Sequence, residues 1–328
     1  MYKADANESP YGLPKEQMER LFAKIEKAGL MQYPENHDNV KKALANYTGL
    51  SAEYFICGNG SDELIAMTIL ALAKGGKVVI CAPTFGMYAE CAKNYGCEVA
   101  ILQCDENLQL DIKVYTAFAK SEKANVVVLC NPNNPTGQKL QREEVEQFIK
   151  EVGCTVILDE AYSEFSGVSC IDLVRKYPDL IVLRTLSKAF GVAGIRFGYL
   201  AAAKELKEKI EAYRPIYNLG IMPLLAAETA LEDTRYMEEA KSKITAERVR
   251  LEVAFVKLQK VKPLKSAANF ILIRCDNGEK LAYEMTAAGV TPRTYGDEVL
   301  KGCVRVTIGT PAQNDIILKV LEAYDAKS

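Results

Sequence analysis

Seven short apolar runs between residues 55 and 201 constrain the fold more than any other feature of the chain. They lie at 55–57, 78–82, 98–102, 125–130, 155–158, 180–183 and 197–201. Most are apolar at successive positions instead of at alternate ones, which is typical of strands covered on both faces. Helical segments separate most of the runs, and strands that alternate with helices predict a parallel sheet. We therefore expect an α/β fold built on a large, mostly parallel sheet.

The pattern changes after Gly220, where the chain predicts a second, smaller α+β unit. Its expected elements are helices at 224–232 and 235–259, a strand at 269–274, a helix at 279–288, a strand at 303–308 and a helix from Ala312. Residues 1–13 read as an extended arm, followed by helices at 14–28 and 38–47. We expect a large domain at 35–234. The arm and first helix (1–34) are expected to pack beside a small C-terminal domain (235–328).

Composition excludes several classes of protein. A net charge of −2 gives no reason to expect nucleic acid or an anionic membrane as a partner. The longest apolar run, 64–73, is too short to span a bilayer, and the first residues contain no apolar signal region, so a cytoplasmic location is expected. The ten cysteines form no Cys-x-x-Cys pair. They predict buried, reduced thiols, with no disulfide framework and no metal site.

A single histidine, His37, excludes further chemistry. One imidazole cannot build a Ser-His-Asp triad or a multi-histidine metal site within one chain. Because histidine is the usual general base near neutral pH, a proton carrier here must be another group, such as a lysine of lowered pKa. His37 itself is expected at the surface or at an interface.

Residues 185–196 follow the strand-like run at 180–183 and carry the strongest chemical signal. They include Thr185, Ser187, Lys188 and Arg196, with glycines that allow a ligand close to the backbone. Open α/β sheets bind ligands at the carboxyl ends of their strands. A lysine at such a place is unusual, because lysines are rarely buried without a partner or a purpose.

Two turns after earlier strands carry weaker signals of the same kind. The segment 58–62, with Ser61 and Asp62, joins a strand to a helix N-terminus, which is a natural phosphate site. It lacks the endings of a Walker loop and of a dinucleotide fingerprint. Phe85 follows the next strand, where an aromatic ring can stack on a planar ligand. Taken alone, the first segment is better explained by a capped helix start and the second by core packing.

Two more strand ends place polar side chains at the same edge of the sheet. Asn134 lies in the proline-rich turn 131–137, where its amide can donate to a ligand oxygen. Asp159 ends the apolar run at 155–158, and a buried carboxylate there needs a cationic partner or a metal. Tyr162 lies three residues further on and can reach the same ligand.

Taken together and in this order, the segments resemble fold-type I pyridoxal-phosphate enzymes of the class I and II aminotransferase group. The resemblance runs from Asn7 to Thr310, nearly the whole chain. Four segments are most similar to the branch that acts on histidinol phosphate. They are Tyr11-Gly12, Tyr33-Pro34, the sequence of residues 131–137 and that of residues 304–310. Threonine-phosphate decarboxylases share much of this pattern.

The resemblance implies a role for each residue around a pyridoxal 5′-phosphate cofactor. Lys188 would bind the cofactor covalently and move protons, and Asp159 would pair with the ring nitrogen. Tyr162, with Asn134, would hydrogen-bond the ring's phenolic oxygen, and Phe85 would stack on its face. Related enzymes more often have tyrosine or tryptophan at the position of Phe85. The implied catalytic residues are Lys188, Asp159 and Tyr162, and the implied cofactor-binding residues are Gly60, Ser61, Asp62, Phe85, Asn134, Asp159, Tyr162, Thr185, Ser187, Lys188, Arg196 and Tyr33.

The resemblance also implies substrate contacts and a partner subunit. Arg305 resembles the arginine that receives the substrate's acidic group, and Arg293 is a second candidate; two arginines suit a phosphate as well as a carboxylate. Tyr33 would reach across a homodimer interface to the cofactor phosphate. Asn7 and Tyr11 would line the substrate entrance.

The implied activity is the transfer of an amino group between L-histidinol phosphate and 2-oxoglutarate or glutamate, a step of histidine biosynthesis. Threonine-phosphate decarboxylation and a broad or aromatic amino-acid specificity stay open as alternatives. A binding protein that keeps the cofactor as a sensor is disfavoured by the full set of cofactor residues.

Overall fold

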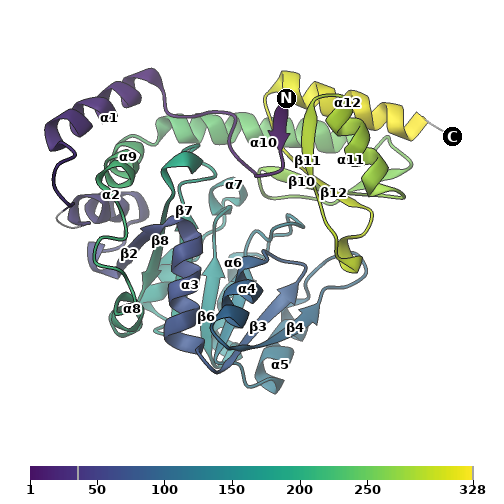
Figure 1. Cartoon of the computed structure of the whole chain (residues 1–328). Helices are drawn as coiled ribbons and strands as arrows, with labels where there is room; N and C mark the ends of the chain where they lie inside the picture. Colours follow the sequence, from purple (N-terminus) through teal and green to yellow (C-terminus); the bar gives the residue numbers. More distant parts are fainter. Residues whose placement is uncertain (35–36, 327–328) are drawn as a thin grey trace.

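The computed structural model describes residues 1–34 and 37–326, and a seven-stranded sheet forms its centre (Figure 1). The strands are β2 (Phe55–Asn59), β3 (Lys77–Ala82), β4 (Glu98–Gln103), β5 (Val126–Cys130), β6 (Thr155–Asp159), β7 (Leu180–Thr185) and β8 (Phe197–Ala202). Their order in the sheet is β2-β8-β7-β6-β5-β3-β4. β8 is antiparallel to both of its neighbours, whereas β3 to β7 are mutually parallel. The seven predicted strands and the mostly parallel sheet are confirmed.

The uninterrupted apolar character of these strands is explained by two separate layers of helices. On one face, Val128, Ile157 and Ile181 share a core with α3 (Gly60–Ala73), α4 (Met87–Asn94) and α8 (Lys204–Glu211). On the other face, Val127 and Val156 pack with α5 (Ile112–Ser121) and α6 (Arg142–Val152). Successive strand residues point to opposite faces, so a strand covered on both sides must be apolar throughout.

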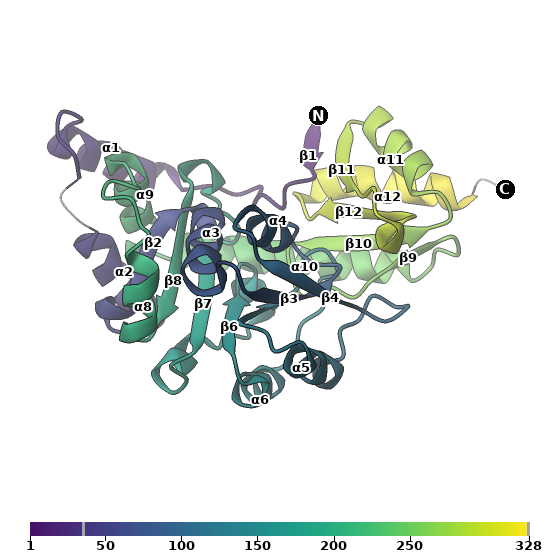
Figure 2. The same ribbon diagram turned by 60° about the horizontal axis from the view of Figure 1, so that its bottom comes forward.

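A second sheet of five strands is formed by both ends of the chain. Its order is β1 (Tyr2–Ala4), β11 (Val290–Thr294), β12 (Cys303–Thr307), β10 (Phe270–Cys275) and β9 (Val261–Pro263). Only β10 and β12 are predicted from the sequence. β9 and β11 contain Pro263 and Pro292, which are unfavourable signals for a strand. β1 has three residues and forms because it pairs in parallel with β11. Figure 2 shows the purple β1 beside β11.

The remaining helices connect or cover the two sheets. They are α1 (Lys15–Ala28), α2 (Asp38–Thr48), α7 (Ser163–Ser166), α9 (Ile221–Glu232), α10 (Arg235–Phe255), α11 (Gly278–Ala287) and α12 (Pro311–Ala326). The long α10 runs from the side of the large sheet to the small sheet (Figure 1). One apolar cluster includes Phe190 near the large sheet, Tyr236 and Phe255 on α10, and Phe270 on β10. The two sheets therefore share a continuous core.

The sequence suggested that the first helix packs beside the C-terminal unit, but in the structure it packs elsewhere. α1 packs on α9, where Lys24 forms ion pairs with Glu228 and Glu232, both at 2.8 Å, and Gln17 donates to the carbonyl of Asp233. Contacts between residues two hundred positions apart decide this placement. The division into a domain at 35–234 and another at 1–34 with 235–328 stays a prediction, and its first boundary falls at residues 35 and 36, outside the described residues.

The prediction that His37 lies at the surface is wrong. The residue precedes α2, which packs against α9, and it is 9% exposed. Burial, together with the nearby cations Arg214 and Lys41, lowers the pKa of His37 to about 4. Its imidazole is therefore neutral at physiological pH.

The ten cysteines all carry free thiols, seven of them buried. Within the described residues, none of the helices has the length and apolar character needed to cross a bilayer.

A buried ion pair joins the carboxyl ends of β6 and β7. Arg184 donates through Nε and Nη2 to Oε2 of Glu160, at 3.0 and 2.8 Å, and Nη1 lies 3.8 Å from Glu164. Glu160 also accepts from the Ser169 hydroxyl and the Cys170 amide. Because Glu160 follows Asp159 and Arg184 precedes Thr185, the pair fixes two strand ends whose last residues, Asp159 and Thr185, line a cavity.

Replacing Arg184 tests this bridge. Arg184→Ala leaves the Glu160 carboxylate, 2% exposed, without its cation, so the free energy of unfolding should fall by about 3–5 kcal/mol. Arg235→Ala is the matched control, because its pair with Asp233 lies at the surface, where solvent screens it, and should change the free energy of unfolding little. Urea denaturation followed by circular dichroism measures both. Equal stabilities of the two variants would show that the buried pair contributes little.

Candidate active site

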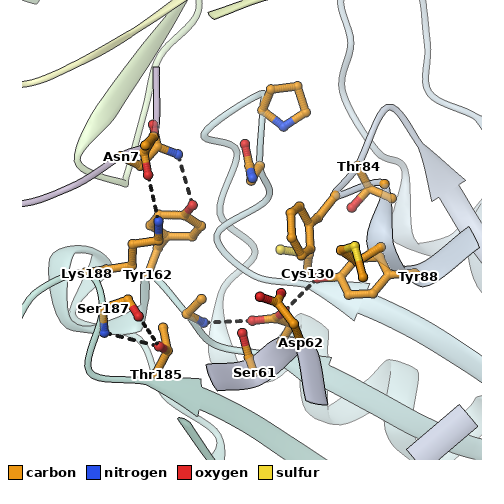
Figure 3. A pocket seen from close by; sticks show the side chains of 18 of the residues that line it. Asn7, Ser61, Asp62, Thr84, Tyr88, Cys130, Tyr162, Thr185, Ser187 and Lys188 are labelled. Atoms are coloured by element: carbon orange, nitrogen blue, oxygen red, sulfur yellow. Dashed lines mark hydrogen bonds between the residues drawn. The ribbon is translucent and has the colours of Figure 1, made fainter. Parts of the chain in front are cut away.

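A cavity of about 530 Å³ lies between the carboxyl ends of the large sheet's strands and the small sheet (Figure 3). Cys130, Asp159 and Thr185 end β5, β6 and β7, and all three line it. The N-terminal arm contributes one wall and β12 another. The predicted site residues that line the cavity are Asn7, Ser61, Asp62, Phe85, Asn134, Asp159, Tyr162, Thr185, Ser187, Lys188, Arg196, Arg293 and Arg305.

Three predicted site residues do not line the cavity of their own chain. Gly60 lies directly behind it, at the start of α3. Tyr11 packs with its ring 5.3 Å from the ammonium of Lys243. Tyr33 is exposed and stacks on Tyr217, with ring centroids 4.3 Å apart. The role of Tyr33 was predicted for a neighbouring subunit, so it stays a prediction.

Asp159 is a buried carboxylate whose partners are hydrogen-bond donors. The Tyr88 hydroxyl donates to Oδ2 at 2.7 Å and the Ala161 amide donates to Oδ1 at 2.9 Å. No lysine or arginine of the described chain forms an ion pair with it. Burial raises the pKa of Asp159 above its usual value, and the two hydrogen bonds oppose that rise only in part. A cationic group that entered the cavity at this point would stabilise the carboxylate.

Lys188 reaches the cavity from the turn after β7 and lies under the N-terminal arm. Its ammonium donates to the carbonyl of Ala6 at 2.8 Å and lies 5.8 Å from the centre of the Tyr162 ring (Figure 3). Burial and, next, the positive charge of Arg305 lower the pKa of Lys188 to about 8. Roughly a tenth of this amine is therefore unprotonated and nucleophilic at pH 7, far more than for a lysine of ordinary pKa.

The opposite end of the cavity is built to hold an anion. Ser61 and Asp62 lie in the first turn of α3, where helix amides have no carbonyl partner within the helix. Arg196 donates to Oδ2 of Asp62 at 3.0 Å and to the Ser187 hydroxyl at 3.4 Å. Ser187 also accepts from Thr185 at 2.9 Å. The carboxylate of Asp62 is thus held by Arg196, which leaves the backbone of this turn as its contribution to anion binding.

Close backbone contacts explain the glycines around this turn. Gly60 has a φ of +75°, and a Cβ there would lie 2.5 Å from Nη2 of Arg196. A Cβ on Gly198 of β8 would lie 2.6 Å from the Ser61 amide nitrogen. Arg196 itself has a φ of +52°, a conformation that costs a non-glycine residue roughly 1–2 kcal/mol. This strain is tolerated where it brings the guanidinium against the start of α3.

Asn134 and Tyr162 present free hydrogen-bond donors in the part of the cavity between Lys188 and the anion site at the start of α3. Oδ1 of Asn134 accepts from Nη1 of Arg305, which orients its amide nitrogen as a donor for a guest. The Tyr162 oxygen accepts from Nδ2 of Asn7 at 2.9 Å, so its own proton is available. Asn7 is 1% exposed and is fixed by Thr307 and Asn269. It therefore positions Tyr162 at least as much as it lines the cavity.

Arg305 and Arg293 form a pair of cations on the small-sheet side. They face each other in the register of β12 and β11. Arg305 is 7% exposed, and its second terminal nitrogen donates to the carbonyl of Asp5. Like charges at directly opposed strand positions repel, so an anion bound between them would stabilise the pair.

Sequence reasoning missed several residues of the cavity. Tyr88, the donor to Asp159, lies one helical turn after Phe85, which was the only available signal for it. Tyr295 follows β11, which was itself not predicted. Thr84 donates to Oδ1 of Asn133 at 2.8 Å and so joins the turn after β3 to the turn after β5. The other unpredicted lining residues are Asp5, Ala6, Gly86, Met87, Glu90, Cys130, Pro135 and Ala161.

These features fit pyridoxal 5′-phosphate. The buried, raised-pKa carboxylate of Asp159 suits a protonated ring nitrogen, and the anion site at α3 and Arg196 suits the phosphate. The unprotonated fraction of Lys188 suits the aldehyde. The Phe85 ring lines the wall between them, next to Tyr88 at a centroid distance of 5.7 Å.

Fold and site together define a class of protein. Residues 3–321 match the family described as aminotransferase class I and II, and the chain belongs to that family. A histidinol-phosphate aminotransferase of Clostridium novyi is 34% identical over 329 residues, which is 99% of this chain and 92% of that protein.

Two solved structures are similar along nearly their whole length. The histidinol-phosphate aminotransferase of Clostridium acetobutylicum has a TM-score of 0.90 and 29% identity, covering 99% of both chains. That of Sinorhizobium meliloti, solved in complex with pyridoxal-5′-phosphate, has a TM-score of 0.87 and 25% identity, covering 98% of this chain and 91% of its own. The expected fold-type I architecture is confirmed.

The lowered pKa of Lys188 predicts a pH-dependent reactivity. In the cofactor-free protein, its acylation by acetic anhydride should rise with a midpoint near pH 8 instead of near 10.5. Arg305→Ala removes a cation that disfavours the charged amine, so the midpoint should move to higher pH. Mass spectrometry of the Lys188 peptide measures the rate, with the exposed Lys15 in the same digest as a reference for the reagent. A wild-type midpoint near 10.5 would contradict the electrostatic account.

Proposed function

We propose that the protein transfers the amino group of L-histidinol phosphate to 2-oxoglutarate with pyridoxal 5′-phosphate as cofactor. The observation that carries the proposal is one cavity that joins the Lys188 amine and the Asp159 carboxylate to a pair of opposed arginines. The first two groups serve the cofactor, and the arginines serve an acidic substrate. The relatives described above support this choice of substrate.

The residues of the chain have separate tasks in this reaction. Bound pyridoxal phosphate supplies an aldehyde that accepts the amino group and a ring that delocalises electrons from the substrate's Cα. Asp159 holds the ring nitrogen protonated. Lys188 removes and returns the proton at Cα, for which a pKa near neutrality is well suited. Tyr162 and Asn134 donate hydrogen bonds that orient the ring.

Arg305 and Arg293 bind the acidic end of each substrate in turn. A guanidinium fork matches both a phosphate and a carboxylate, so one site can serve histidinol phosphate and then 2-oxoglutarate. The two positive charges favour the phosphate, because it carries nearly two negative charges at neutral pH.

A homodimer is supported by exposed apolar side chains on two neighbouring segments. Leu30, Met31 and Tyr33 lie before α2, and Ile216 and Tyr217 lie before α9. The Tyr33–Tyr217 stack brings the segments together. A second copy of the chain would cover this surface and bring Tyr33 towards the partner's cavity. Sedimentation velocity tests this, and a monomer at micromolar concentration would contradict it. The ten free thiols support a reducing, cytoplasmic location.

Isotope transfer tests the reaction directly. The cofactor-loaded protein is incubated with 2-oxoglutarate and with L-histidinol phosphate that carries ¹⁵N at its amine. The wild-type protein should yield ¹⁵N-glutamate, and Lys188→Ala should yield none. Arg305→Ala should raise the KM for histidinol phosphate about tenfold to a hundredfold, because a charged hydrogen bond is lost. Arg235→Ala, at the surface, is the control.

Two results would replace the proposal. Histidinol phosphate has no carboxylate, so release of carbon dioxide from O-phospho-L-threonine without label transfer would identify a decarboxylase. Label transfer from aromatic amino acids but not from histidinol phosphate would identify a different amino donor.

A further inference from the structure

Tyr295 lines the cavity with a hydroxyl that lacks a partner. The hydroxyl is buried, yet it has no hydrogen-bond partner among the described residues. Its ring packs with a small apolar cluster that includes Leu300 and Cys303. The ring is therefore held by the small sheet, and the hydroxyl is not needed for that packing.

Two more unpaired donors belong to the same cavity. Arg305 uses both terminal nitrogens on Asn134 and Asp5, but its Nε is buried without a partner. The side chain of Arg293 is exposed and makes no hydrogen bond or ion pair within the described chain. The positive charges of Arg305 and Arg293 both act on the Tyr295 hydroxyl, but burial is the larger effect and raises its pKa, so the hydroxyl stays protonated and is a donor.

Buried donors without a partner, here the Tyr295 hydroxyl and Nε of Arg305, are unfavourable. An acceptor-rich guest would satisfy both at once, and the exposed side chain of Arg293 would add a third donor. Asp5 lines the cavity beside Arg305, and Asp297 acts on the Tyr295 hydroxyl less strongly than either arginine, so the arginines dominate the electrostatic environment of that hydroxyl. These properties describe a site for a small oxyanion.

We propose that Tyr295 donates a hydrogen bond to the terminal phosphate of the amino donor and makes this site prefer phosphate over carboxylate. The inference rests on the proposed function, which places the substrate's acidic group at Arg293 and Arg305. A phosphate monoester presents three terminal oxygens, enough for three separate donors. A carboxylate presents two, which the arginines already occupy.

Removing the hydroxyl alone tests the inference in turnover. Tyr295→Phe keeps the ring and its packing and should lower kcat/KM for histidinol phosphate about tenfold, equivalent to about 1.4 kcal/mol. The value for 2-oxoglutarate should change less than about twofold, because the carboxylate does not use the hydroxyl. Tyr283→Phe, on the exposed side of α11, is the matched control. An equal loss for both substrates, or no loss, would overturn the inference.

A binding measurement separates this inference from the proposed reaction. In the cofactor-loaded enzyme the cofactor's own phosphate fills the other anion site, so calorimetric titration with inorganic phosphate reports on the Arg293–Arg305 site. Tyr295→Phe should weaken phosphate binding about tenfold and leave glutarate binding within about twofold. If phosphate binding shows this loss while histidinol phosphate is not a substrate, the reaction is wrong and the role of Tyr295 stands. If wild type and Tyr295→Phe bind phosphate equally, or if neither binds it, the role of Tyr295 is wrong.

Discussion

The buried carboxylate of Asp159 is the constraint on which the site depends. It lies at the end of β6, is 3% exposed, and receives hydrogen bonds from Tyr88 and Ala161, with no cationic partner among the described residues. Such a buried carboxylate is stabilised when a positively charged ligand forms an ion pair with it. The Arg184–Glu160 pair next to it anchors the strand end. The large sheet thus provides a fixed negative charge in a cavity whose other walls are mostly neutral or positive donors.

The small sheet and the N-terminal arm complete what the large sheet begins. The arm joins β11 as β1 and then passes over the cavity, where Ala6 accepts from Lys188 and Asn7 donates to Tyr162. β12 brings Arg305 to Asn134, 171 positions earlier in the chain. In the proposed function, the groups for the cofactor therefore come mainly from the large sheet, and the groups for an acidic substrate come mainly from the small one.

The sequence predicted the elements that carry their own local signal and missed those that depend on distant partners. Continuous apolar runs identified the strands of the large sheet, and polar residues directly after them identified Asp159, Asn134 and Lys188. Tyr88 was missed because its partner lies 71 positions away. Tyr295 was missed because β11 contains a proline and forms only between β1 and β12. The placement of α1 depends on ion pairs with α9 that no local pattern reveals.

The central claim, that Asp159 pairs with the ring nitrogen of the cofactor, is tested most directly by a binding comparison. Equilibrium dialysis would measure the affinities of pyridoxal phosphate and of an analogue with carbon in place of the ring nitrogen, for wild type and for Asp159→Asn. The wild-type protein should prefer pyridoxal phosphate about tenfold or more, since a charged hydrogen bond contributes about 1.5–3 kcal/mol, and Asp159→Asn should lose that preference. The same preference in both proteins would contradict the account.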